Sequence, residues 1–416
     1  MDLRDKLRQM GAAGTVSPKP APVESDLERL IPGEVVENAA GTCYRVVRQW
    51  PLDETHGAVR LDRFTASSPE AFALAGKDDT LTGLDLREAL FIDTETTGLA
   101  GGAGTVPFLV GLGWIEGEQF RVEQYFMREY HEEAAVLMAI EKALEGRNWL
   151  VSYNGKSYDL SLLASRYILN RARSPFEALP HWDLLHAARR FWKMRLTDCS
   201  LGSVERHILG FTREGDVPGF MIPQLYFDYL RDKRTARLEP VFSHNQLDIV
   251  SLLGVAGVLG GLVSSPQTEI VHGEDWLALA RLHADRYDWP QAIKAYTEAL
   301  NLGLPDHFET GVRWQKSLCH KRAGEWEEAL AIWRQLSRNG GLGVLPYEEA
   351  AKYFEHRAHD LVKAKTTVLS ALKRINLRQQ LGRGVEDGEA RDRLEYRLAR
   401  LERKIAAIGG SVKEVY

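Results

Sequence analysis

The stretch FIDTETTGL, residues 91–99, ends a run of apolar residues with two acidic side chains, Asp93 and Glu95. Its composition is typical of a buried β-strand, in which residues i and i+2 face the same side of the sheet. Two carboxylates on one side repel each other and are costly to remove from water. The stretch therefore predicts a cationic partner for the pair.

The segments around this strand alternate as in an α/β domain. Residues 105–127 predict two strands joined at Glu116-Gly117, residues 131–146 a helix, residues 148–154 a strand and residues 159–173 an amphipathic helix. This order, β-β-β-α-β-α, predicts a mixed sheet with helices on both faces.

The flanking sequence indicates further parts. Residues 1–25 have no apolar signal core and are rich in Pro, Ala and Ser, so we expect a flexible segment. Residues 26–85 predict hairpins that pack on a domain at residues 86–265. The apolar run at residues 249–263 is shorter than the roughly 20 residues that span a membrane. We interpret it as a buried helix and expect no membrane partner.

Three segments beyond Pro266 repeat one pattern: YDWPQAIKAYTEAL (287–300), GEWEEALAIWRQL (324–336) and HDLVKAKTTVLSAL (359–372). Aligned, they share a small residue at one position and a large one at another: Ala292, Ala329 and Ala364, then Tyr296, Trp333 and Val368. A repeat of about 34 residues with such positions resembles tetratricopeptide repeats. The resemblance implies an all-α domain at residues 270–378 that binds a protein partner, with a capping helix at residues 379–416.

Composition and charge exclude some classes of protein. The 416 residues carry a net charge of −5, so the chain is no polycation, and its length predicts two or three domains. Three cysteines without a C-x-x-C pair argue against a zinc knuckle and suit the reducing cytoplasm, where we expect the protein. One stretch is basic, with seven cations opposed by only Glu177 and Asp183: Arg166, Arg171, Arg173, Arg189, Arg190, Lys193 and Arg195. It predicts either a solvated helix surface or a local site for phosphates.

Two further motifs place a carboxylate on a predicted helix. In YNGKSYD (153–159), Asn154 ends a strand and Asp159 opens a helix, where an ordinary N-cap is the alternative interpretation. In SHNQLDIVSLL (243–253), His244 and Asp248 are four residues apart and share one face of a helix. A lone His in this setting is usually structural.

Other polar residues are weaker candidates. Asp183 in HWDLLH is a fifth candidate acid, and His181 and His186 flank it, but an N-cap is the favoured interpretation. Arg213 and Asp216 lie in a turn-rich loop that could line a substrate path, although loops are polar for ordinary reasons.

Taken together, four carboxylates come from one strand and two helices: Asp93, Glu95, Asp159 and Asp248. Ligands that are all oxygen suit hard divalent cations such as Mg²⁺ or Mn²⁺ rather than Zn²⁺. Two such ions about 4 Å apart stabilise the attacking and leaving oxygens of phosphoryl transfer. The sequence therefore predicts that two divalent cations neutralise the carboxylate pair on the strand.

The motifs DTETTG (93–98), NGKSYD (154–159) and HNQLD (244–248) resemble the three motifs of the DEDD superfamily of exonucleases. Segments from HWDLLHAARRFWKMRL to HNQLDIVSLL are similar to the YprB-type ribonuclease-H-like domain family. The resemblance covers residues 30–265. It implies a ribonuclease-H-like mixed sheet of five strands flanked by helices.

The resemblance also implies a role for each carboxylate. Asp93 would contact both metal ions. Glu95 and Asp248 would hold the ion that carries the nucleophilic water, and Asp159 would help to hold the other ion.

The remaining motif residues would serve the water and the substrate. His244 would be the general base. Thr96 and Leu99 would meet the terminal nucleotide. Asn154 and Tyr158 would steady either the substrate end or the waters of the second metal ion. Branches that use a His place it five residues before the Asp, whereas here the spacing is four, which turns the His by about 100° on a helix. Two roles for His244 therefore stay open: it approaches the water from a different direction as the base, or it only orients the water.

The function implied is a metal-dependent 3′–5′ exonuclease acting on single-stranded ends of DNA or RNA. Two alternatives stay open. The same metal site could serve a structure-selective endonuclease, or the repeats could belong to a scaffold whose nuclease domain is inert. End preference depends on the shape of the pocket, which the motifs do not describe.

Overall fold

The computed structural model describes residues 26–98, 104–381 and 388–411, so the predicted flexible segment at residues 1–25 lies outside the described residues. The chain forms two compact units, each with its own hydrophobic core. The first, which we call the sheet unit, contains the residues up to Pro69 with residues 83–185 and 200–258. The second, the helical unit, contains residues 70–82, 186–199 and 259–416.

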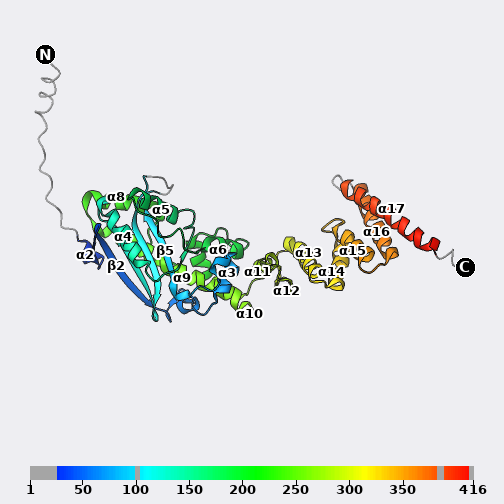
Figure 1. Ribbon diagram of the computed structural model, residues 1–416, viewed down its shortest axis with the longest axis horizontal. Coiled ribbons are helices and arrows are strands. Elements are labelled where there is room, and N and C mark those ends of the chain that lie inside the picture. The colour runs from blue at the N-terminus through cyan, green and yellow to red at the C-terminus, as the bar shows by residue number, and fades with distance from the viewer. Residues whose placement is uncertain (1–25, 99–103, 382–387, 412–416) are drawn as a thin grey trace, which may run out of the picture. The chain divides into compact units, whose positions relative to one another are not determined.

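A mixed sheet of seven strands forms the centre of the sheet unit (Figure 1). The strands follow the order β1 (Glu34–Asn38), β2 (Gly41–Pro51), β7 (Gln119–Phe126), β6 (Pro107–Glu116), β5 (Ala89–Thr96), β8 (Trp149–Ser152) and β9 (His181–Asp183). β5 pairs in parallel with β8, and β8 with β9, whereas the other neighbours are antiparallel. The predicted mixed sheet is therefore confirmed, with the strand FIDTETTGL near its middle.

The expectation of five strands is wrong, because β1 and β2 from residues 26–85 extend the same sheet. β2 pairs with β7 along its length, from Tyr44 opposite Phe126 to Pro51 opposite Gln119. Without β2, β7 would be an edge strand with unpaired backbone N–H and C=O groups. The second hairpin of this segment, β3 (Thr55–His56) with β4 (Val59–Arg60), forms a separate two-stranded sheet.

The elements that follow β5 have the predicted order. β6 and β7 form a hairpin that turns at Gly117, whose φ of +59° favours glycine. Then come α4 (Glu133–Ala143), β8, α5 (Asp159–Leu169) and β9. The unit also contains the helices α2 (Leu27–Leu30), α7 (Leu201–Val204) and α8 (Ile222–Asp232).

The apolar run at residues 249–263 lies in the long helix α9 (Glu239–Ser264). The helical segment Thr235–Ser264 is long and apolar enough to cross a membrane, but 83% of its most apolar window is buried inside the protein. Its apolar side chains therefore serve as core, as predicted for a buried helix. All three cysteines are buried.

The helical unit contains α3 (Pro69–Gly76), most of α6 (Leu184–Trp192), and a series of helices after α9: α10 (Pro266–Glu269), α11 (Gly273–Asp285), α12 (Trp289–Leu302), α13 (Asp306–Ala323), α14 (Trp326–Asn339), α15 (Leu345–His356), α16 (Leu361–Gln380) and α17 (Gly388–Ser411). From α11 onward each helix packs on the next one in the chain (Figure 1).

The repeated residues occupy equivalent places in this series. Ala292, Ala329 and Ala364 are each the fourth residue of a helix, in α12, α14 and α16, and all three are fully buried. The large residue of each copy follows one turn later and is also buried: Tyr296, Trp333 and Val368. Small residues there let neighbouring helices approach, and the large residues fill the space between them.

A buried acid attaches the last helix, α17, to the series. The side chain of Glu355 in α15 is fully buried and forms ion pairs at 2.7–2.9 Å with three cations of α17: Arg397, Arg400 and Lys404. Burial alone would raise the pKa of Glu355, but hydrogen bonds from Lys404 and Arg400 outweigh it and lower the pKa to about 2. The predicted cap of the series is therefore held by charge as well as by the buried Leu394 and Leu401.

Glu355→Gln is expected to destabilise the helical unit by about 2–3 kcal/mol, because three cations lose their shared partner but stay partly exposed to water. The stabilisation by Glu355 should be fully present above its unfolded pKa, near 4.3, and lost as the pH falls toward 2. Urea unfolding at pH 7 and pH 3 would measure both effects. Glu328→Gln, at an exposed position of α14, is the control; equal stabilities of the two variants would contradict the prediction.

Candidate functional site

Asp93 and Glu95 lie on the face of β5 that α9 covers. Asp93 is paired with Gly111 of β6, and Phe91 with Gly113. A Cβ atom on Gly111 would lie 2.3 Å from Asn245 Oδ1, and one on Gly113 would lie 2.5 Å from Ile249 Cγ2. Because both positions are glycine, α9 can lie close against the sheet beside the carboxylates.

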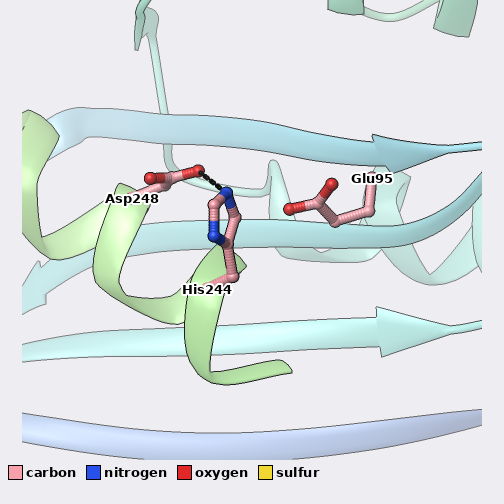
Figure 2. A group of neighbouring side chains, drawn as sticks. All are labelled: Glu95, His244 and Asp248. Atoms are coloured by element: carbon pink, nitrogen blue, oxygen red, sulfur yellow. Dashed lines mark ion pairs between the residues drawn. The ribbon is translucent and has the colours of Figure 1, made fainter. Parts of the chain in front are cut away.

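This close approach brings the first and third motifs together. Ligand atoms of Glu95, His244 and Asp248 all lie within 4.8 Å of one another. Figure 2 shows Glu95 reaching from the strand toward the two α9 side chains. His244 Nε2 is 3.5 Å from Asp248 Oδ2, so the four-residue spacing places the ring directly beside this carboxylate.

Asn245, which sequence reasoning missed, joins α9 to Asp93. Its Nδ2 donates a hydrogen bond to Asp93 Oδ2 at 2.9 Å, and its Oδ1 accepts one from Gln124 Nε2 at 2.9 Å. Gln124 also donates to the carbonyl of Phe242. Asn245 is fully buried, so it orients the Asp93 carboxylate within the core. A polar residue inside the apolar face of the α9 sequence was the available signal.

The second motif lies beside the first. Asp159 is the first residue of α5 and is buried, and it accepts a hydrogen bond from Thr94 Oγ1 of β5. The N-cap of α5 is Tyr158, so Asp159 does not take the N-cap position that the alternative interpretation gave it. Asp93 and Asp159 lie outside the group of three, but their charges reach each other and Asp248.

The predicted substrate residues are only partly brought together. Tyr158 OH donates to the carbonyl of Gly98 and lies 3.0 Å from Thr96 Oγ1. Asn154 is exposed with a φ of +66° and donates its backbone N–H to Asp183 Oδ1 at 2.8 Å. Leu99 lies outside the described residues.

The fifth candidate acid, Asp183, is bound by backbone amides. Besides the amide of Asn154, it accepts hydrogen bonds from Lys156 N at 3.1 Å and from Leu185 N at 3.1 Å at the start of α6. It therefore caps α6 and holds the turn before α5. Its flanking His181 lies 2.8 Å from Ser152 Oγ.

Burial and like charge raise the pKa values of the motif carboxyl groups. The pKa of Asp93 lies well above its ordinary range because of burial and the charges of Asp248 and Asp159. Burial and the charge of Asp93 do the same to the pKa of Glu95. Burial raises the pKa of Asp159 to about 6, against the hydrogen bond from Thr94. The cluster thus holds more negative charge than its surroundings neutralise.

Arg213, which the sequence placed in a loop, is part of the site. Its guanidinium donates to Asp248 Oδ1 and forms a two-point contact with Glu205, including Nε to Oε2 at 2.9 Å. Its side chain is only 9% exposed. Glu205 opens a single π-helical turn, η5 (Glu205–Leu209), and is buried. Arg213 therefore supplies a positive charge to Asp248 of the third motif, although it lies outside all three motifs.

The network continues into the N-terminal strands. Ser251 Oγ of α9 donates to Glu205 Oε1, and His56 Nε2 of β3 lies 2.7 Å from Ser251 Oγ. Burial, with a smaller contribution from the charge of Arg213, lowers the pKa of His56 to about 4, so this ring is neutral at pH 7. Residues 26–85 thus support the site through a buried hydrogen bond.

Arg213→Met is expected to destabilise the metal-free protein by about 3 kcal/mol, because Glu205 and Asp248 would lose a buried cation. Urea unfolding in EDTA at pH 7 would measure the loss. The control is Arg206→Met, because Arg206 lies in the same π-helical turn but is exposed. Its free energy of unfolding should stay within about 0.5 kcal/mol of the wild-type value. Equal effects of the two substitutions would contradict this role of Arg213.

His244 has a defined orientation. Its Nδ1 lies 2.7 Å from Asp216 Oδ1. Arg213 Nη1 also lies 3.3 Å from this nitrogen. A carboxylate can only accept, so a proton on Nδ1 would be donated to Asp216 and would leave Nε2 as an acceptor beside Asp248. A cavity of about 360 Å³ opens beside these groups, lined in part by Arg206, Arg213 and His244.

Similarity to a known protein covers most of the chain. Residues 90–259 match the RNase_H superfamily. The chain is 30% identical over 375 residues to the uncharacterized protein YprB of Bacillus subtilis (strain 168), which covers 88% of this chain and 87% of that protein. Among solved structures, the family B DNA polymerase of the archaeon Pyrobaculum calidifontis matches with a TM-score of 0.36 and 15% identity, over 71% of this chain and 38% of the polymerase chain.

The superfamily match spans all three motifs, from β5 to α9, and the match to YprB extends over most of the chain, including the helical unit. An identity of 30% over 375 residues shows common descent of most of the chain rather than of one motif. The chain therefore belongs to the same family as YprB, and its residues 90–259 form an RNase H superfamily domain.

Proposed function

We propose that this protein is a metal-dependent 3′–5′ exonuclease that hydrolyses phosphodiester bonds in DNA or RNA. The observation that carries the proposal is the convergence of Glu95, His244 and Asp248 within 4.8 Å, inside an RNase H superfamily domain. Asp93 and Asp159 flank this group from β5 and α5. A buried cluster of acids with a histidine is costly unless it has a function that uses its charge.

The donor set fits two divalent cations, Mg²⁺ or Mn²⁺. Asp93, Glu95, Asp159 and Asp248 offer only oxygen ligands, and the raised pKa values of the first three indicate a shortage of positive charge. Asp93 and Asp159 would hold one ion, and Asp93, Glu95 and Asp248 the other. When bound, such ions would activate a water and stabilise the charge on the attacking and leaving oxygens.

His244 would act as the general base in this proposal. In the tautomer in which Nδ1–H donates to Asp216, Nε2 would accept the proton of the attacking water. Asp216 would also stabilise the imidazolium that forms. Removing Asp216 should leave the ring present but poorly oriented.

The substrate end would lie between β5 and α5. Thr96 and Tyr158 form a hydrogen-bonded pair anchored on the carbonyl of Gly98, next to the predicted nucleotide contact at Leu99. Such a pair can position a terminal sugar through hydroxyl hydrogen bonds. The exposed Arg206 in the neighbouring cavity would attract a phosphate.

Degradation of end-labelled strands tests the proposal. Single-stranded DNA, duplex DNA and single-stranded RNA would be incubated with Mn²⁺ or Mg²⁺, with Asp93→Asn beside the wild type. A ladder of single-nucleotide steps from the 3′ end, absent in the variant, is expected. Discrete larger fragments would instead indicate an endonuclease on the same site.

A complete lack of cleavage would contradict the proposal when metal binding is also absent. If the wild type cuts none of the three substrates and calorimetry detects no Mn²⁺ binding, the exonuclease proposal fails. The chain would then be an inert scaffold, in which the helical series binds a protein partner.

A further inference from the structure

The helical unit contains a basic cavity of about 300 Å³ away from the three motifs in sequence. We call it the α6 groove and define it by its charged lining: Lys77, Arg189, Arg190, Lys193, Arg281 and Asp285. The cations come from three places in the chain, namely α6 and the residue after it, the turn after α3, and α11. Five cations against one acid make this a local excess of positive charge in a chain whose net charge is −5.

The structure separates these cations from the rest of the basic stretch at residues 166–195. Arg166 pairs with Glu133 of α4 at 2.8 Å, and Arg195 pairs with Asp275 of α11 at 2.8 Å, so both are neutralised inside the protein. The side chains of Arg189 and Lys193 instead are exposed. The two residues lie on one helical turn, because the backbone amide of Lys193 donates a hydrogen bond to the carbonyl of Arg189. Of the seven cations in this stretch, Arg189, Arg190 and Lys193 line the groove, whereas the exposed Arg171 and Arg173 lie outside its lining.

Most of the groove cations have no internal counter-charge. Lys77 pairs with Asp285 at 2.6 Å, and Arg190 donates to the carbonyl of Ala75 at 2.8 Å. Within the described part of the chain, no carboxylate lies at ion-pair distance from Arg189, Lys193 or Arg281. Like charges gathered around one cavity repel each other, and an anionic ligand would offset that cost.

A second cavity continues the groove. It has a volume of about 330 Å³ and shares Arg281 and Asp285 with the first. Its lining includes Trp289 and Arg322, whose guanidinium lies 5.0 Å from the centre of the Trp289 ring. Basic side chains that follow a strand backbone, with an aromatic ring for a base, are the features by which proteins bind single strands.

We propose that the α6 groove and this second cavity bind the sugar-phosphate backbone of a single-stranded nucleic acid. Arg189, Lys193 and Arg281 would contact successive phosphates, and Trp289 would stack on a base. The inference rests on the proposed function, because it takes the bound strand to be the nuclease substrate. The inference adds a substrate-binding surface that the helical unit forms. All three motifs lie in the sheet unit instead.

The test measures binding without cleavage. Full-length Asp93→Asn protein in EDTA would be titrated into a fluorescein-labelled 20-nucleotide strand of DNA or RNA, over a range of salt concentrations. Arg189→Gln with Lys193→Gln should weaken binding about tenfold at 0.1 M salt and reduce the slope of log affinity against log salt by about 1.4, at 0.7 for each lost phosphate contact. The matched control is Arg338→Gln with Lys373→Gln, which removes two exposed cations of α14 and α16 outside both cavities.

The outcomes separate this inference from the proposed function. Equal affinities of the groove variant and the control variant for the strand would overturn the proposal that the groove binds nucleic acid, even if the wild type cleaves strands. Loss of binding in the groove variant alone would support it, even if no cleavage is ever observed. Competition by polyglutamate as strong as that by unlabelled strand would also overturn it, in favour of an acidic protein partner.

Discussion

Asp93→Asn is expected to reduce the rate of strand cleavage by about 10³-fold, while the fold stays intact. In the proposed mechanism Asp93 would contact both divalent cations, so its loss removes charge stabilisation of about 4 kcal/mol from the transition state. The substituted amide keeps an oxygen that can accept the hydrogen bond from Asn245 Nδ2, now 2.9 Å from the carboxylate. Single-turnover cleavage of an end-labelled strand would measure the rate.

The same substitution should separate metal binding from folding. A ligand at 100 times its dissociation constant stabilises a protein by about 2.7 kcal/mol, so Mn²⁺ should raise the melting temperature of the wild type but hardly that of Asp93→Asn. An equal shift in both proteins would contradict the assignment of Asp93 as a metal ligand. Cleavage at the wild-type rate would contradict its role in the reaction.

The pH dependence of stability gives a control for folding. In the metal-free protein the pKa of Asp93 is raised, so the folded state holds its proton more tightly than the unfolded state. The stability from this group is fully present below its unfolded pKa, near 3.9, and is lost as the pH rises through the folded value. Asn cannot ionise, so Asp93→Asn should be at least as stable as the wild type at pH 8 in EDTA.

Gly111→Ala is the second substitution with a large expected effect. The added Cβ would lie 2.3 Å from Asn245 Oδ1, which the buried Gln124 holds in place, so α9 must move away from β6. His244 and Asp248 would move with it, and displacements of about 1 Å in such sites cost about 10²-fold in rate. Overpacking of a core also costs about 1–3 kcal/mol of stability.

The measurements are cleavage rate and urea unfolding of Gly111→Ala. Gly311→Ala is the matched control, because nothing lies within 4 Å of a Cβ at that position in α13. A helical Gly→Ala change there should leave the rate unchanged and raise stability by about 0.5–1 kcal/mol. Wild-type cleavage by Gly111→Ala would show that the distance between α9 and the sheet does not control the site.

The local elements of the site could be predicted because their signals are local. Alternation and apolar length identify β5 and its hairpin partners, and the four-residue spacing places His244 and Asp248 on one face of α9. The i and i+2 spacing likewise places Asp93 and Glu95 on one face of the sheet. These features depend only on the side-chain periodicity of helices and strands, which residues close together in the sequence determine.

The number of strands could not be predicted in the same way. β1 and β2 read as a separate hairpin, because nothing within residues 26–85 shows that β7 needs a partner along its free edge. The division of the basic stretch could not be predicted either. Arg166 and Arg195 form ion pairs with Glu133 and Asp275, which lie far from them in the sequence. Pairing over such distances depends on the folded arrangement of whole elements.

The sequence by itself determined which groups are candidates for the chemistry: four carboxylates and a histidine on a strand and two helices, within an RNase H superfamily domain. Only the tertiary structure decided how they meet. Gly111 sets the approach of α9, Asn245 orients Asp93, and Arg213 reaches Asp248 from a distant loop. Backbone periodicity acts within a few residues, whereas close packing and buried ion pairs form between elements that only folding brings together.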